Sequence, residues 1–262
     1  MSLVEMVKLL EDEKQYVQYS ALKSLSYICE DAGEAVISHG QFLQVLQAVV
    51  KKGEAGEHFM RYVCKVVDSL CQAEGSTGAF GSISHDLASV FMGYIESNHS
   101  DSIVNTCFGT LMNLIKCANN PDLALKYIEH ILGRVDKIDR LGQEKRALFY
   151  SGFFTIINTS LLTIRRAGGT IRLDLLSTLY SLVNNHFQKI NNVEGDGYYI
   201  VSALAYFIPN DRRLVDDFWK YIEFGLKRVN EDEVFRATIS CICDFAAIYR
   251  ESIADKIDPI FN

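Results

Sequence analysis

The chain has 262 residues, of which 48% are hydrophobic, so it is long and apolar enough to bury a continuous core and is not disordered. Its net charge of -7 lies in short acidic and basic pairs without a basic stripe, which argues against direct nucleic-acid binding and favours basic protein partners. The 7 cysteines are an odd number, lie mostly on apolar helical faces, and indicate reduced thiols in a cytosolic or nuclear compartment.

Proline and strand patterns are both scarce. Pro121 and Pro209 lie where segments change, which favours long uninterrupted helices. Valine-rich alternating runs bounded by turn residues are absent, so we expect an all-α fold. We find neither a charged-then-apolar leader nor an apolar run of about 18 residues, and therefore expect neither secretion nor membrane insertion.

The first strongly periodic segment runs from Lys14 to Gly33. Its apolar residues recur three or four positions apart and would form one stripe on a helix: Val17, Ala21, Leu22, Leu25, Ile28 and Cys29. A single helix cannot bury such a stripe, so another helix must cover it.

The same stripe recurs along the chain, first 42 residues further on, from 17 to 59, and then after another 44, from 59 to 103. The second copy contains Phe59, Val63, Cys64, Val67, Leu70 and Cys71, and the third contains Ile103, Cys107, Phe108, Leu111, Leu114 and Ile115. A last copy fits with one threonine: Val234, Thr238, Ile239, Ile242, Phe245 and Ala246. The copies between fit less well, with Phe149, Phe153, Phe154, Ile157 and Leu161 in the fourth and Val201, Ala205 and Ile208 in the fifth.

A second amphipathic segment follows each of these first helices. We predict the second helices at Gln41 to Lys51, Ile83 to Ser97, Asp122 to Val135, Ile171 to Ile190 and Leu214 to Arg228. A helical hairpin of about 40 to 47 residues is the period of HEAT or armadillo repeats, and two helices per period favour HEAT. We therefore predict a right-handed superhelical solenoid in which neighbouring repeats cover one another.

The domain organisation expected is a single HEAT-repeat array over residues 1–262. It would hold about five complete repeats and a partial repeat at each end, since "MSLVEMVKLL" resembles a lone second helix and "SIADKIDPIFN" begins a closing helix. We expect a fragment of a longer protein, acting as a monomer.

Acidic residues recur on the predicted second helices, with one tryptophan among them. If these helices line a concave surface, the set would attract Lys/Arg-rich cargo. The set is Asp86, Glu96, Asp122, Glu129, Asp174, Asp216, Asp217, Trp219 and Glu223. The alternatives are an ordinary solvated face for the acids and packing between hairpins for the tryptophan.

Aromatic residues lie on the predicted first helices of the last two repeats. A groove between outer helices could take a phenylalanine ring there, although most such aromatics are expected in the core. They are Tyr198, Tyr199, Phe207, Phe235 and Tyr249.

Motifs for chemistry are weak throughout. The segment "AEGSTGAFGS" lacks the Gly-Lys-Ser/Thr ending of a phosphate-binding loop, so we expect a mobile linker. Cys241 and Cys243 would point about 200° apart on a helix and do not form a metal pair. No histidine lies near a nucleophile in a recognisable pattern. We expect no enzyme activity, no metal and no cofactor.

Three further stretches are informative together: "YSALKSLSYICEDAGEAV", "RYVCKVVDSLCQAEG" and "DDFWKYIEFGLKRVNEDEVFRATISCICDF". In sequence and in order they resemble the central HEAT repeats of the importin-β family of nuclear transport receptors. The resemblance implies a flexible superhelix that binds cargo or an importin-α-like adaptor on its concave face and phenylalanine-glycine (FG) nucleoporins on its convex face. It also implies release of cargo by Ran-GTP in the full-length receptor, and residence in cytoplasm, nucleus and nuclear pore.

One departure from the importin-β pattern concerns the adaptor. The family carries tryptophans at positions matching Lys23 and Lys65, where they help to hold a basic adaptor helix. Lysine would instead repel a cation, which puts importin-α binding in doubt. The alternative function is a static HEAT-repeat scaffold of an adaptor or phosphatase-regulatory complex.

Overall fold

The computed structural model describes residues 2–39, 41–51, 56–81, 83–97, 100–189, 194–208 and 212–261, so Ile190 and Pro209 lie outside the described residues. The described residues form α-helices and one short 3-10 helix, η1, without a β-strand, as predicted. The elements are α1 (Leu3–Leu9), α2 (Gln15–Ile37), α3 (Phe42–Lys51), α4 (Glu57–Gln72), α5 (Ser84–Glu96), α6 (Asp101–Ala118), α7 (Pro121–Leu132), α8 (Val135–Ile138), α9 (Gln143–Arg166), α10 (Leu173–Lys189), α11 (Glu194–Ala205), α12 (Arg212–Leu226), α13 (Asp232–Tyr249), η1 (Arg250–Ile253) and α14 (Ala254–Phe261). The five predicted second helices correspond to α3, α5, α7, α10 and α12, with bounds within about three residues.

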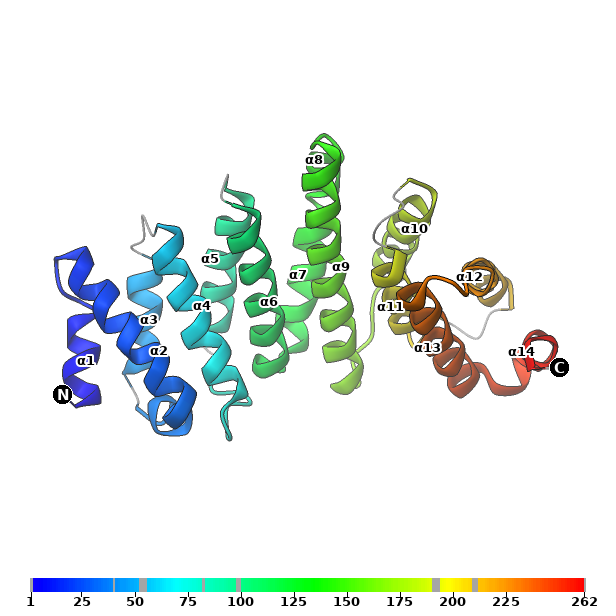
Figure 1. Ribbon diagram of the computed structural model, residues 1–262. Helices are drawn as coiled ribbons and strands as arrows, with labels where there is room; N and C mark the ends of the chain where they lie inside the picture. The colour runs from blue at the N-terminus through cyan, green and yellow to red at the C-terminus, as the bar shows by residue number, and fades with distance from the viewer. Residues whose placement is uncertain are drawn as a thin grey trace. The chain divides into compact units, whose positions relative to one another are not determined.

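The chain divides into two compact units, Met1–Leu123 and Ala124–Asn262. In the first unit, α4 packs between α2 and α6, and these three first helices form one row. The second helices α3 and α5 pack on each other in a second row, and α5 also packs on α6 (Figure 1). All six stripe positions of α6 are buried, and α4 and α5 both pack on this helix.

The second unit repeats this arrangement. The first helix α11 packs between α9 and α13, while α10 packs on α11 and α12 packs on α13. The stripe copies that fit least well in the sequence are nonetheless mostly buried here, including Phe153 and Phe154 on α9 and Val201 on α11, while Phe149 is half-buried. The prediction of one continuous array over residues 1–262 stays a prediction.

Polar side chains join neighbouring first helices at the repeat spacing. On α4, Asp68 accepts hydrogen bonds from Thr110 Oγ1 at 2.9 Å and Asn113 Nδ2 at 3.0 Å, both on α6. On α9, Ser151 Oγ donates to Asp196 Oδ2 of α11 at 2.8 Å. Further along α11, Ser202 donates to Asp244 of α13. These inter-repeat polar bonds fix the register of adjacent first helices.

The carboxyl group of Asp68 should contribute to the free energy of unfolding in a way that depends on pH. Burial raises its pKa, against the lowering effect of the two hydrogen bonds. The folded state therefore holds the proton more tightly than the unfolded state, so this contribution to the free energy of unfolding falls as pH rises through the folded pKa. The Asp68→Asn variant lacks this titration. Its free energy of unfolding minus that of wild type should therefore increase as pH rises from about 4 towards 7. Urea denaturation at several pH values measures this, with the exposed Asp174→Asn as the control; a constant difference for Asp68→Asn would contradict it.

The glycine-rich segment after α4 is a packed turn rather than a free linker. Phe80 is fully buried, and the Gly78 amide, in the left-handed region at φ 82°, donates to the Cys117 carbonyl of α6 at 3.0 Å. The glycines indicate a turn in the sequence. The contact that holds the turn in place could not be predicted, because it involves Cys117, about 40 positions further along the chain.

The expectation that no stretch of about 18 residues is sufficiently apolar is wrong for helix α9, which is long and apolar enough to cross a membrane on length and composition alone. Within the protein, however, 56% of its most apolar 18-residue window is buried. Its apolar residues include Phe153, Phe154 and Ile157, which lie in the core of the second unit. The apolarity of α9 is therefore explained by its packing.

Candidate protein-binding site

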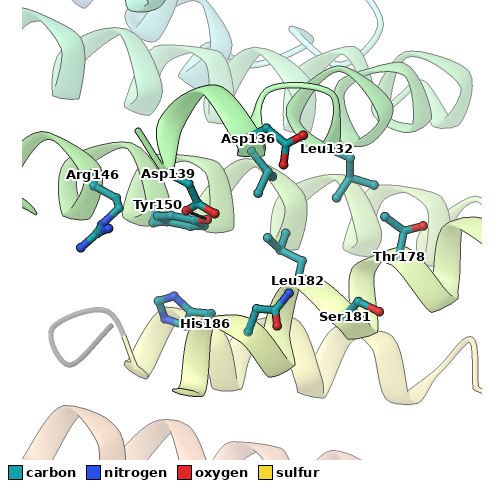
Figure 2. A pocket seen from close by; sticks show the side chains of 11 residues that line it. Leu132, Asp136, Asp139, Arg146, Tyr150, Thr178, Ser181, Leu182 and His186 are labelled. Carbon is teal, nitrogen blue, oxygen red and sulfur yellow. Dashed lines mark hydrogen bonds between the residues drawn. The ribbon is translucent and has the colours of Figure 1, made fainter. Parts of the chain in front are cut away.

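A cleft of about 400 Å³ opens in the second unit, between two walls that face each other in Figure 2. One wall is a stripe along α10, made of Thr178, Ser181, Leu182, Asn185 and His186. Their spacing of three and four residues places them on one face of that helix. The other wall comes from the end of α7, from α8 and the residue after it, and from the start of α9: Leu132, Val135, Asp136, Asp139, Arg146 and Tyr150.

The cleft combines a buried aromatic floor with charged groups nearer to solvent. Tyr150 and His186 are both buried, and Phe154 packs edge-on against each, with ring centroids 5.7 Å and 4.4 Å apart. Asp136 and Asp139, by contrast, are exposed. A ligand entering the cleft therefore meets carboxylates first and aromatic rings beneath them.

The Tyr150 hydroxyl links the floor to the charged rim. It donates a hydrogen bond to Asp139 Oδ1 at 2.7 Å. Burial, followed by this bond to Asp139, raises the pKa of Tyr150, and the charge of Arg146 opposes that rise. The tyrosine therefore stays protonated and fixes one oxygen of Asp139, which leaves the other oxygen as an acceptor.

This chemistry suits a long cationic side chain. Two carboxylates can accept charge-assisted hydrogen bonds from an ammonium or guanidinium group, and the hydroxyl and amide groups of α10 can bond to peptide groups beside it. Arg146 limits the net charge of the cleft, so the cleft suits one cationic side chain of a partner rather than several at once. Among the described residues, no group of three or more His, Cys, Asp or Glu residues could hold a metal ion.

In the first unit, the predicted acidic residues lie apart from one another. Asp86 on α5 is half-buried and accepts a hydrogen bond from Gln47 of α3. Glu96 is half-buried in the last turn of α5, and Asp122 is exposed in the first turn of α7. These acids are thus spread over two second helices, and one of them is engaged with a neighbouring repeat.

In the second unit, most of the predicted acids have basic partners in the same unit. Arg172 contacts both Glu129, at 3.1 Å, and Asp174, at 3.3 Å. Asp216 pairs with Lys256 at 2.9 Å and Asp217 with Lys220 at 2.6 Å, while Glu223 is exposed. Except for that of half-buried Lys256 with Asp216, these ion pairs are exposed and contribute little to stability, and all of them reduce the charge that the predicted surface offers a basic ligand.

The predicted aromatic residues divide between core and surface. Trp219 is 2% exposed and packs on Phe245, and Lys256 Nζ lies 5.9 Å from its ring centroid. Tyr198 and Tyr249 are buried, and their hydroxyls donate to the carbonyls of Tyr221 and Ala205. Their positions favour the packing interpretation.

The other three predicted aromatics are accessible. Tyr199 is 39% exposed, and Phe207 and Phe235 are half-buried. The structure places Tyr199 on α11 and Phe235 on α13, which pack on each other. A role for these side chains in binding FG repeats stays a prediction.

The cleft is not among the sites predicted from the sequence. The available signal was the polar and apolar stripe at 178, 181, 182, 185 and 186 on a helix that was already predicted. The opposite wall depends on the four-residue helix α8, which is too short to show a period.

Lys65, at one of the two positions that depart from the importin-β pattern, has partners of its own. Its Nζ lies 2.9 Å from Glu30 Oε1 and 5.2 Å from the ring centroid of Tyr27. The hydrogen bond to Glu30 raises its pKa. The charge of Lys65 is therefore offset by that of Glu30, and the doubt about importin-α stays a prediction.

No family model and no curated protein matches this sequence. Solved structures do match its fold. A crystal structure of importin-β has a TM-score of 0.77 at 14% identity over 99% of the chain, and yeast importin-β (Kap95p) has 0.79 at 13% over 99%. A Kap95:Nup1 complex has a TM-score of 0.80 at 13% identity over 99%. This chain spans about a third of those proteins, namely 33%, 32% and 32% of their chains.

A designed armadillo repeat protein in complex with the peptide (KR)4 has a TM-score of 0.61 at 15% identity, over 94% of this chain and 100% of that one. At such identities, these likenesses establish the fold alone. The chain is an all-α repeat solenoid of the HEAT or armadillo kind, as the period of the hydrophobic stripes predicted.

Proposed function

We propose that this chain is a segment of a nuclear transport receptor of the importin-β kind. It binds basic cargo or an adaptor along its second helices and FG nucleoporins along its first helices, without catalysis. In the full-length receptor, Ran-GTP regulates this binding between cytoplasm and nucleus. The observation that carries the proposal is the match to importin-β structures over 99% of the chain, one of which is a complex with Nup1.

The cleft beside α10 supplies the anchor for the basic partner. Asp136 and Asp139 receive a lysine or arginine side chain, whose apolar stem lies against the aromatic floor. The designed armadillo protein bound to (KR)4 supports a basic peptide as a ligand for this class of fold. The acids of the second-helix surface, most of which have partners, would then contribute mainly to the rate of association.

Neutralising the two cleft carboxylates tests this anchor. Titration of a fluorescent Lys/Arg peptide with the double variant Asp136→Asn/Asp139→Asn should show binding weakened about ten- to a hundredfold, because two charge-assisted hydrogen bonds are lost. The control is Asp31→Asn/Glu34→Gln, which removes the same charge from exposed positions of α2. Equal weakening in both variants, or no binding by the unmodified chain, would reject the anchor.

Binding of an FG peptide separates a transport receptor from a static scaffold. We expect a weak, saturable interaction that perturbs the NMR signals of Tyr199 and Phe235, since these aromatics are accessible on adjacent first helices. The measurement is a titration with a peptide of several FG repeats, and a peptide with serine in place of phenylalanine is the control. Identical spectra with both peptides would favour the scaffold of an adaptor or phosphatase-regulatory complex.

A further inference from the structure

Arg146 brings a positive charge to the same wall of the cleft as the two carboxylates. It is half-buried, and it lines the cleft together with Asp139 and Tyr150. Figure 2 shows these three side chains next to one another, with the Arg146 guanidinium directed out from the wall. The charge of Arg146 acts on the Tyr150 hydroxyl, where it opposes the rise in pKa. One wall of the cleft therefore has an acidic part and a cationic part.

The Arg146 guanidinium has no ion-pair partner among the residues that the structure describes. In the same unit, by contrast, Arg172 and Arg228 each contact a carboxylate of the protein itself. A guanidinium offers five N–H donors in a planar fork that matches the two oxygens of a carboxylate. The donors of Arg146 line the cleft, so a carboxylate that enters the cleft can accept from them.

The stability of α9 does not account for a cation at this position. Arg146 is the fourth residue of the helix, near the end that carries the positive charge of the helix dipole. A cation is unfavourable there, and partial burial also removes part of its hydration. An anion bound beside Arg146 would offset both effects, because its sign is opposite to that of the guanidinium and of the helix end.

We infer that Arg146 binds an acidic side chain of the same partner that places its basic side chain at Asp136 and Asp139. The inference rests on the proposed function, since it takes the basic partner of the cleft as given. The partner segment carries an aspartate or glutamate close to its lysine or arginine, and two oppositely charged contacts hold it. A purely basic segment meets Arg146 as a repulsive charge, so Arg146 selects segments of mixed charge.

Two peptides that differ at one position test the inference. Each is blocked at both ends and carries one arginine in a Ser/Gly sequence. Glutamate or glutamine stands two positions after the arginine, because alternate residues of an extended segment project to the same side. Fluorescence anisotropy at low salt should show about tenfold tighter binding of the glutamate peptide, from one added charge-assisted contact. The net charge of the chain, -7, favours the opposite order, so general electrostatics cannot produce this result.

Three variants assign the preference to its residue. Arg146→Gln should abolish the preference for glutamate, and Arg146→Lys should keep part of it, because the charge stays while the planar fork is lost. The control Arg140→Gln removes the same charge from an exposed position that does not line the cleft, and it should leave the preference unchanged. Equal binding of the two peptides by the unmodified chain, or a preference that persists in Arg146→Gln, would overturn the inference.

Failure of the anchor gives a different result in the same titrations. If Asp136→Asn/Asp139→Asn weakens the binding of both peptides but the unmodified chain does not prefer glutamate, the anchor stands and the inference about Arg146 alone is overturned. Unchanged binding by that double variant overturns the anchor, and a glutamate preference that is lost in Arg146→Gln still supports an acidic ligand for Arg146. No binding of either peptide by the unmodified chain rejects both.

Discussion

Replacing Phe245 with alanine should lower the free energy of unfolding of the second unit by about 3 to 5 kcal/mol. The Phe245 ring is fully buried on α13, and its centroid lies 6.4 Å from those of Phe218 and Trp219 and 5.3 Å from that of Tyr249. Truncation removes apolar area from the core and leaves a cavity among rigid rings that cannot collapse. Urea denaturation followed by the fluorescence of Trp219, the one tryptophan of the chain, measures the loss directly.

The matched control is Phe224→Ala on α12. Phe224 is 47% exposed, so the same deletion should change the free energy of unfolding by less than about 1 kcal/mol. Because contacts in a solenoid are between neighbours, Phe245→Ala should also speed amide hydrogen exchange in α11 to α13 while α2 to α6 keep their protection. Uniform acceleration along the chain would contradict the repeat-by-repeat origin of stability.

Replacing Gly225 with alanine should destabilise the second unit by about 2 to 4 kcal/mol, although alanine is the better helix former. A Cβ at this position of α12 would lie 2.1 Å from Thr238 Oγ1 and 2.7 Å from the Tyr198 hydroxyl. Neither group can move freely, since Thr238 donates to the Val234 carbonyl and Tyr198 to the Tyr221 carbonyl. The added methyl group must therefore break a buried hydrogen bond or separate α12 from its neighbours.

At a second glycine, replacement with alanine should have the opposite effect on stability. Gly109 lies within α6 with no heavy atom within 4 Å of an added Cβ, so Gly109→Ala should raise stability by up to about 1 kcal/mol. Urea denaturation of both variants under the same conditions gives the comparison. If Gly225→Ala were neutral or stabilising, the close approach of α12 to Tyr198 and Thr238 would be incorrect.

The helical repeat could be predicted from the sequence because packing between neighbours imposes a period on the apolar residues. The stripes of α2, α4 and α6 repeat cleanly, and the second helices follow from the lengths between them. Most residues of the weaker copies on α9 and α11 are buried all the same, since the neighbouring first helices pack on both sides of α11. Local pattern therefore determines the fold wherever each repeat resembles the last.

The candidate site was harder to predict because exposure is not a property of residue type. Tryptophan and tyrosine are residue types that are common at binding sites. In this protein, however, the side chains of Trp219, Tyr198 and Tyr249 are buried in the second unit. The cleft joins a stripe on α10 to residues 28 to 54 positions earlier, which include Tyr150 and Asp139. No local period links those two walls, so three-dimensional packing alone brings them together.

The inter-repeat polar bonds bear on how such a chain can evolve. Asp68 depends on Thr110 and Asn113, and Asp196 depends on Ser151, so each carboxylate has its donors on the adjacent repeat. Deleting or transplanting one repeat would leave a half-buried carboxylate without its hydrogen-bond donors. If two neighbouring repeats were duplicated together, the donor and the acceptor would be copied together. Two repeats, rather than one helical hairpin, are therefore the unit that can be duplicated without losing these bonds.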